Sequence, residues 1–227
     1  MPHHPLLVHR RSLGVGVLLH RRSLGVGVPL VLPLLLALTL LLTTGCSSSG
    51  LGRTWASPDA QARPFTRLAV IALTKQEAYR MQAEDALVAE MNGRGVSSYS
   101  LLPGLNALRD TAAVLKAVRD AGCDGLVTLQ LKSSTVKPDP NAEPVATSTT
   151  AAQELDDYWI DPSAQTTQAF APGQYFAVEV HVFDLKQGKK VWDGLAVEQD
   201  ARDAADLVRM VRDDVMRDLR QKGLVGN

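Results

Sequence analysis

Apolar residues change their spacing several times along the chain, and each spacing predicts one kind of element. The continuous apolar run at 67–73 is typical of a buried strand, and helical spacing follows it to about residue 92. A short segment at 96–101 and an alternating one at 125–132 predict two further strands, with a helix over 108–121 between them. This βαβαβ order favours parallel strands joined by right-handed crossovers.

Strict alternation of apolar and polar residues returns at 174–185 and predicts a strand with Phe176, Val178, Val180 and Val182 on one face. A turn and a second strand at 191–199 complete an antiparallel hairpin. Helical spacing over 204–222 predicts a last helix. The predicted fold class is therefore α/β (α+β): one domain with a mixed sheet and helices packed on it.

The first predicted helix carries signals for its start and for one ion pair. Thr74 stands where a cap is needed, and Glu77 completes a capping box three residues later. Arg80 and Glu84 have the spacing of a helical ion pair. The apolar residues that helical spacing places near one face are Ala78, Met81, Leu87, Val88 and Met91.

The interval 137–172 interrupts these patterns and predicts a long loop, rich in Pro, Ala, Thr and Ser. A loop of this length inside a compact domain is usually functional or disordered. Its aromatic residues are binding anchors if they are exposed, and two carboxylates precede them. The alternative is that the aromatic side chains fold back and cover the sheet. The residues of this candidate partner-binding loop are Asp156, Asp157, Tyr158, Trp159 and Phe170.

The first 45 residues have the composition of a signal peptide. Four arginines and no acidic residue come before an apolar run at 29–42, whose 14 residues are fewer than the roughly 20 that span a bilayer. An uncleaved membrane anchor is the alternative. The pair Arg21-Arg22 leaves export by the twin-arginine route open beside the general secretory route.

The apolar run leads into Thr43-Thr44-Gly45-Cys46, which resembles the lipobox of bacterial lipoproteins. The resemblance implies cleavage after Gly45 and transfer of a diacylglyceryl group to the Cys46 thiol, with the chain then anchored by its lipid. A free cysteine near an ordinary cleavage site is the alternative. Ser47, where Asp would favour the inner membrane, implies sorting to the outer membrane in a Gram-negative host. The predicted organisation is a signal peptide at 1–45, a tether at 46–66 and a periplasmic domain at 67–227.

Composition and charge narrow the chemistry of the mature chain. It has 20 basic and 24 acidic residues, and its net charge of −4 argues against a nucleic-acid partner. His181 is its only histidine, and the strand pattern places it on an exposed outer face. Cys123, between a predicted helix and strand, fits a buried structural cysteine, with a reactive thiol as the alternative. These residues do not make a metal site, and we expect no cofactor and no enzyme activity.

The order of elements resembles a family of small periplasmic lipoproteins related to the N-terminal domain of TolB, to LpoB and to the core of CsgG. The resemblance implies a domain that binds proteins of the cell envelope and is not an enzyme. It spans about residues 67–225. The segments that carry it are Arg67 to Leu73 leading into Arg80 to Asp85, Gly95 to Pro103, Ala121 to Val127, and Val182 to Lys186 followed by Lys190 to Gly194.

The leading functional hypothesis is a lipid-anchored outer-membrane protein whose domain faces the periplasm and binds or scaffolds another envelope component. Its partners would be the membrane, through lipid on Cys46, and an envelope protein. One alternative is a subunit of a CsgG-like secretion or pore assembly, although the prolines and weak alternation of 137–172 do not suit membrane strands. Another is an enzyme that uses the acidic residues of that loop.

Overall fold

The computed structural model describes residues 50–58, 60, 64–134, 136–140, 149–160 and 170–226. They belong to one compact unit, Ser48–Asn227. The predicted signal peptide, the cleavage and lipidation site at Gly45 and Cys46, and Ser47 lie outside the described residues. No helix among those that are described is both long enough and apolar enough to cross a membrane.

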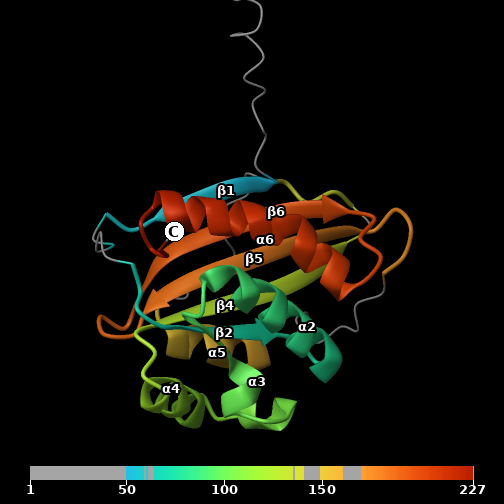
Figure 1. Ribbon diagram of the computed structural model, residues 1–227. Coiled ribbons are helices and arrows are strands. Elements are labelled where there is room, and N and C mark those ends of the chain that lie inside the picture. Colours follow the sequence, from blue (N-terminus) through green and yellow to red (C-terminus); the bar gives the residue numbers. More distant parts are fainter. Residues whose placement is uncertain are drawn as a thin grey trace, which may run out of the picture. The chain divides into compact units, whose positions relative to one another are not determined.

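Six strands of the described chain form one mixed sheet in the order β1-β6-β5-β4-β2-β3 (Figure 1). Strand β2, next to the edge strand β3, pairs in parallel with β3 and β4, and the remaining pairs are antiparallel. The predicted mixed α/β sheet is therefore confirmed. The strands are β1 Leu51–Ala56, β2 Leu68–Leu73, β3 Gly95–Ser97, β4 Gly125–Ser134, β5 Tyr175–Asp184 and β6 Lys189–Gln199.

Helices cover both faces of the sheet. Helices α2 and α6 lie side by side on one face, while α4 and α5 pack on the other (Figure 1). Short helical turns at Ala89–Met91 and Leu105–Arg109 extend the connections. The α-helices are α2 Glu77–Val88, α3 Ser98–Leu101, α4 Thr111–Asp120, α5 Ala151–Ile160 and α6 Ala204–Gln221.

The apolar core forms two layers, one on each side of the sheet. All six residues of β2 are buried because helices cover both of its faces. The alternation predicted for β5 is confirmed, since Phe176, Val178, Val180 and Val182 all lie in the layer beneath α6. The other layer joins Ala69 and Ile71 of β2 to α4 and α5.

The structure differs from the predicted tether at 46–66, because Leu51–Ala56 forms the edge strand β1. It pairs antiparallel with β6, with Trp55 opposite Asp193. Only Leu51 of its six residues is buried, so its sequence carries a weak apolar signal. The predicted strand at 96–101 is also shorter, because only Gly95–Ser97 is extended and α3 follows at once.

Helix α5 lies inside the interval that was predicted to be a loop, so that prediction was wrong for 151–160. The sequence did contain a start signal: Gln153 N donates to Thr150 Oγ1 at 3.2 Å, and Thr149 N donates to Gln153 Oε1 at 3.2 Å. This resembles the Thr-x-x-Gln form of a capping box, with the returning bond to Gln153 made by Thr149, the residue before the cap. The helix buries Ala151, Leu155 and Tyr158 at helical spacing.

The start and the buried face of α2 also differ from the prediction. Gln76 is the N-cap without a side-chain cap, while Thr74 Oγ1 accepts a bond from Gln76 N at 3.3 Å. Met81, expected in the apolar face, is 41% exposed. The buried positions are Arg80, Ala83, Glu84 and Leu87, because the charged pair points inward.

Candidate functional site

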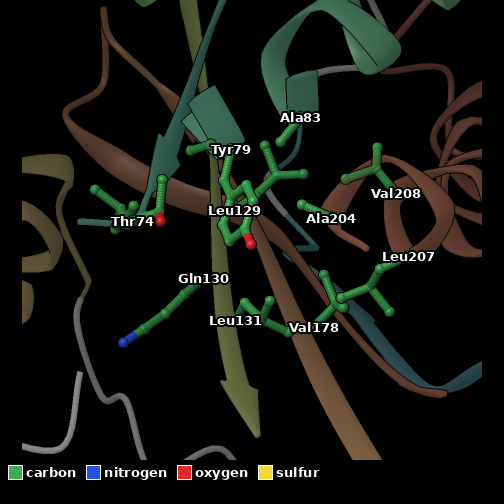
Figure 2. Close-up of a pocket in the computed structure, with 12 residues that line it drawn as sticks. Thr74, Tyr79, Ala83, Leu129, Gln130, Leu131, Val178, Ala204, Leu207 and Val208 are labelled. Carbon is green, nitrogen blue, oxygen red and sulfur yellow. The ribbon is translucent and has the colours of Figure 1, made fainter. Parts of the chain in front are cut away.

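A small apolar pocket opens where α2 and α6 meet the carboxyl ends of β2 and β4 (Figure 2). The chain leaves β2 towards α2 on one face, and β4 is followed by α5 on the other face. Such divergence leaves a crevice between the ends of neighbouring parallel strands. Its walls include Leu73, Tyr79, Ala83, Leu129, Val178 and Leu207.

Tyr79 is the most prominent side chain of this pocket. Figure 2 shows its ring reaching from α2 into the middle of the pocket, between Thr74 on one side and Ala204 on the other. The ring also meets Phe170 edge to face, with centroids 5.7 Å apart, and Phe170 stacks on Phe176 at 5.0 Å. Phe170, one of the predicted binding residues, thus contacts a side chain that lines the pocket.

The size of the pocket limits what it can bind. Its volume is about 40 Å³, which holds roughly three or four water-sized groups. Pockets for small-molecule substrates usually enclose about 300–1,000 Å³. The pocket therefore fits the tip of one aliphatic side chain better than a substrate.

Beneath α2, Arg80 and Glu84 form the predicted ion pair, but in the core rather than at the surface. Arg80 Nε lies 3.1 Å from Glu84 Oε1, and both side chains are fully buried. Glu84 also accepts bonds from Ala72 N, Ser98 Oγ and Tyr99 N at 2.7–3.1 Å. Burial raises the pKa of Glu84 above its usual value, although the bond from Ser98 and the charge of Arg80 oppose the rise. These contacts hold α2 on β2 and α3.

The expectation that His181 is exposed and solvated was wrong. His181 is 2% exposed, and its Nδ1 lies 2.8 Å from Glu154 Oε1 on α5. Thr128 Oγ1 contacts the same oxygen at 3.4 Å. The strand pattern correctly separated His181 from the β5 residues that face α6. That opposite face is not open to solvent, because α5, which lies inside the interval predicted as a loop, covers it.

Asp193 and Arg53 extend this buried polar group across the sheet. Asp193 on β6 is the direct strand partner of His181, so the two side chains share a face. Asp193 Oδ2 lies 3.7 Å from Arg53 Nη2 on β1. Among the described residues, Asp193 Oδ1 and Arg53 Nε have no hydrogen-bond partner, and no group of three or more ligand-type side chains could hold a metal ion. The cluster links α5 to the sheet.

Replacement of Glu154 by Gln should make the stability of the fold depend less on pH in the acid range. Burial raises the pKa of Glu154, but the bond and charge of His181 and the charge of Lys190 outweigh it and lower the pKa below the ordinary 4.5. A carboxylate whose pKa is lower in the folded than in the unfolded state stabilises the folded protein. This contribution is complete above the unfolded-state pKa and is lost as the pH falls through the folded-state pKa. The urea midpoint of Glu154→Gln should therefore change less than that of the unchanged protein between about pH 5.5 and about pH 3.5.

The half-exposed Glu90 provides a matched control for this measurement. Glu90→Gln should keep the acid dependence of the unchanged protein. If Glu154→Gln also kept it, the contact with His181 would not contribute to the acid dependence.

Four of the predicted partner-binding residues lie on α5, but they do not form one exposed surface with Phe170. Tyr158 is 4% exposed and lies in the core, where burial raises its pKa to about 12. Trp159 is half-buried, donates from Nε1 to Leu108 O at 2.9 Å and lies under the Arg109 guanidinium. Asp156, which is exposed, accepts a bond from Thr111 Oγ1 at 2.6 Å, and Asp157 is exposed. Phe170 packs on the opposite side of the sheet from α5.

Cys123 lies where the sequence placed it, between α4 and β4, and is buried in the layer with Val114 and Val118. Burial raises the pKa of its thiol, with the charge of Arg67 as a smaller opposing effect. A thiol with a raised pKa is a poor nucleophile. The residue therefore acts as a small apolar side chain of the core.

Comparison with solved structures finds distant similarity only. A variant PelC dodecamer from Paraburkholderia phytofirmans matches with 12% identity and a TM-score of 0.39, over 77% of this chain and 97% of that one. A second PelC dodecamer from the same organism matches with 10% identity, a TM-score of 0.37 and the same coverage. TolB from Acinetobacter baumannii matches with 17% identity and a TM-score of 0.34, over 77% of this chain and 31% of that one.

Comparison with protein-family models and with curated proteins finds no match. The chain therefore has weak structural similarity to TolB, as the sequence resemblance had suggested in part. Similarity at this level supports no conclusion about activity or assembly.

Proposed function

We propose that the chain is a lipid-anchored protein of the outer membrane whose domain faces the periplasm and binds another envelope protein without catalysing a reaction. Two features support this function. The sequence around Leu41 to Cys46 resembles a signal cleaved at a lipidated cysteine. The domain carries an apolar pocket with the size of a side chain.

The pocket between α2 and α6 is the observation that carries the binding function. Protein interfaces concentrate their binding free energy in a few apolar anchors that enter well-packed pockets. A volume of about 40 Å³ lined mainly by aliphatic residues suits such an anchor. The ring of Tyr79, in edge-to-face contact with Phe170, offers an aromatic surface beside the anchor.

Filling the pocket should weaken partner capture without harming the fold. Ala204 is a buried residue of the pocket wall at the first turn of α6. Ala204→Leu would place three more carbon atoms in the cavity. With a photo-crosslinking amino acid in place of Thr74, irradiation of intact envelopes should give crosslinked partners, and Ala204→Leu should reduce their yield about tenfold, the effect of losing roughly 1.4 kcal/mol.

Three controls make the result specific. A crosslinker in place of Lys116, exposed on α4, should give none of these products. Urea unfolding of Ala204→Leu should show unchanged or slightly increased stability, as for other cavity-filling substitutions. Equal crosslinking yield from Ala204→Leu at equal abundance would contradict the pocket as the binding site. Tyr158→Ala is unsuitable as a test because it would disrupt the core.

A further inference from the structure

The start of β1 makes the connection to Cys46 very short. Gly50 N donates a hydrogen bond to the Asp214 carboxylate on α6, and β1 begins at the next residue. A Cβ atom at position 50 would lie 2.8 Å from Asp214 Oδ2 and 3.0 Å from Glu198 Oε1, so the close approach suits glycine. Only residues 47–49 separate Cys46 from this fixed point.

The length of this connection limits how far the domain can lie from an anchored Cys46. Four Cα-to-Cα steps reach at most about 14 Å when fully extended. The sheet is wider than that: five spacings between β1 and β3 amount to about 24 Å. The β3 end of the sheet, with α3 and α4 beyond it, therefore lies farther from β1 than the connection can reach (Figure 1).

We propose that lipid on Cys46 holds the β1 edge of the sheet directly against the headgroup layer of the bilayer. This inference rests on the proposed lipid anchor and adds a fixed orientation to it. Strand β1 pairs with β6 on one side, and none of the described strands pairs with its other side. Thr54 is exposed on it, and Trp55 is 43% exposed. Tryptophan is enriched at the headgroup level of membranes, where its amphipathic ring suits the environment.

Electrostatic attraction to anionic lipid does not hold the β1 edge at the bilayer in this arrangement. The groups nearest to Gly50 are the carboxylates of Asp214 and Glu198, and Arg217 is paired with Asp214. Burial and the neighbouring Asp214 charge raise the pKa of Glu198. Among the described residues, the side chains closest to Gly50 are therefore mainly acidic and do not attract anionic lipid, so the contact depends on the length of the tether. It should be the same in zwitterionic and anionic vesicles.

The orientation leaves the pocket available to a partner. The pocket lies among β2, β4 and the N-terminal part of α6, away from the β1 edge in the strand order. With β1 at the bilayer, α3 and α4 face the periplasm. A partner reaching Tyr79 would then approach along the membrane surface or from the periplasm.

Fluorescence quenching from the bilayer tests this orientation. The full chain carrying Cys123→Ser and either Thr54→Cys or Lys116→Cys would be expressed, and the processed protein would be purified from membranes and labelled at the new thiol. It would be reconstituted into phosphatidylethanolamine–phosphatidylglycerol vesicles with a spin-label quencher on the headgroups. The label at position 54 should be quenched at least threefold more than the label at position 116, whose side chain is 76% exposed on α4.

A longer tether provides the matched control. Twenty Gly/Ser residues inserted between Ser49 and Gly50 would extend the root-mean-square reach to roughly 25–30 Å and should make the two labels equally quenched. Equal quenching of the two labels with the natural tether would overturn the orientation alone. Mass spectrometry of the same preparations separates the two proposals, because a Cys46 without lipid would overturn the anchor as well.

Discussion

Replacing Arg80 with Met is expected to lower the free energy of unfolding by about 3–5 kcal/mol at neutral pH. Arg80 is fully buried and its Nε contacts Glu84, which is fully buried as well. Met keeps much of the side-chain length but leaves the Glu84 carboxylate without its cation. An uncompensated charge in the core costs far more than the loss of a surface pair.

The same variant should recover stability as the pH is lowered. Burial already raises the pKa of Glu84, and Arg80 is one of the groups that oppose the rise, so its removal should raise that pKa further. A carboxyl group with a raised folded pKa destabilises the protein when ionised, and this cost disappears as pH falls through the folded pKa to below the unfolded one. Urea unfolding at about pH 7.5 and about pH 5.5 measures the recovery.

Lys116→Met is the control for a lost ion pair at the surface. Lys116 and Asp120 have side chains that are 76% and 62% exposed. The loss of this ion pair should change the free energy of unfolding by no more than about 0.5 kcal/mol at either pH. Equal losses for Arg80→Met and Lys116→Met would show that the buried pair has no special role.

Replacing Trp192 with Ala should cost about 3–5 kcal/mol, as expected for a large buried aromatic side chain. Trp192 is fully buried between β6 and α6, and its Nε1 donates to Asp218 Oδ2 at 2.7 Å. Gly194 gives the ring its space, since a Cβ there would lie 2.4 Å from it. The ring therefore fills the core layer and also attaches α6 to the sheet.

Two further variants separate these roles. Trp192→Phe keeps an aromatic ring but leaves Asp218 without its donor, so the loss should fall to about 1–3 kcal/mol. Trp55→Ala removes the same side chain from an exposed position on β1 and should stay within about 0.5 kcal/mol. Urea unfolding followed by far-ultraviolet circular dichroism is the measurement. A Trp192→Ala loss as small as that expected for Trp55→Ala would contradict the assignment of Trp192 to the core.

The fold could be predicted from the sequence where one physical signal dominated. The apolar run of β2, the alternation of β5 and the helical stripe of α6 each reflect burial on a known number of faces. Strand β1 could not be found in this way. It is a sheet edge with glycine and charge in a short segment, and its pairing with β6 brings together residues far apart in the sequence.

The burial of three polar residues was missed because local sequence patterns do not show what covers a side chain in the folded protein. His181 looked exposed because strand alternation reveals which residues share a face, but not whether a helix covers that face. The Thr150 and Gln153 capping pair could have revealed α5, and with it the burial of His181 against Glu154. For Arg80 and Glu84 the helical spacing predicted the pair correctly, but burial depends on the hydrogen bonds from Ala72 and Ser98, which only the tertiary structure supplies.

The pocket could not be predicted from the sequence either. Its walls come from β2, α2, β4, β5 and α6, which are separated by long stretches of chain. No local motif marks Tyr79 or Ala204 as members of one site. Phe170 was identified only because it is aromatic, and its contact with Tyr79 joins residues far apart in the sequence.

The lipid on Cys46 connects the proposed binding function with the orientation of β1, and an intact-mass measurement tests it directly. The full chain would be expressed in a Gram-negative host and extracted from isolated outer membranes. We expect a protein that begins at Cys46 and carries the mass of a diacylglyceryl group, and we expect Cys46→Ala to lose that mass and its membrane retention. A protein found with a free thiol at Cys46 would contradict the lipid anchor.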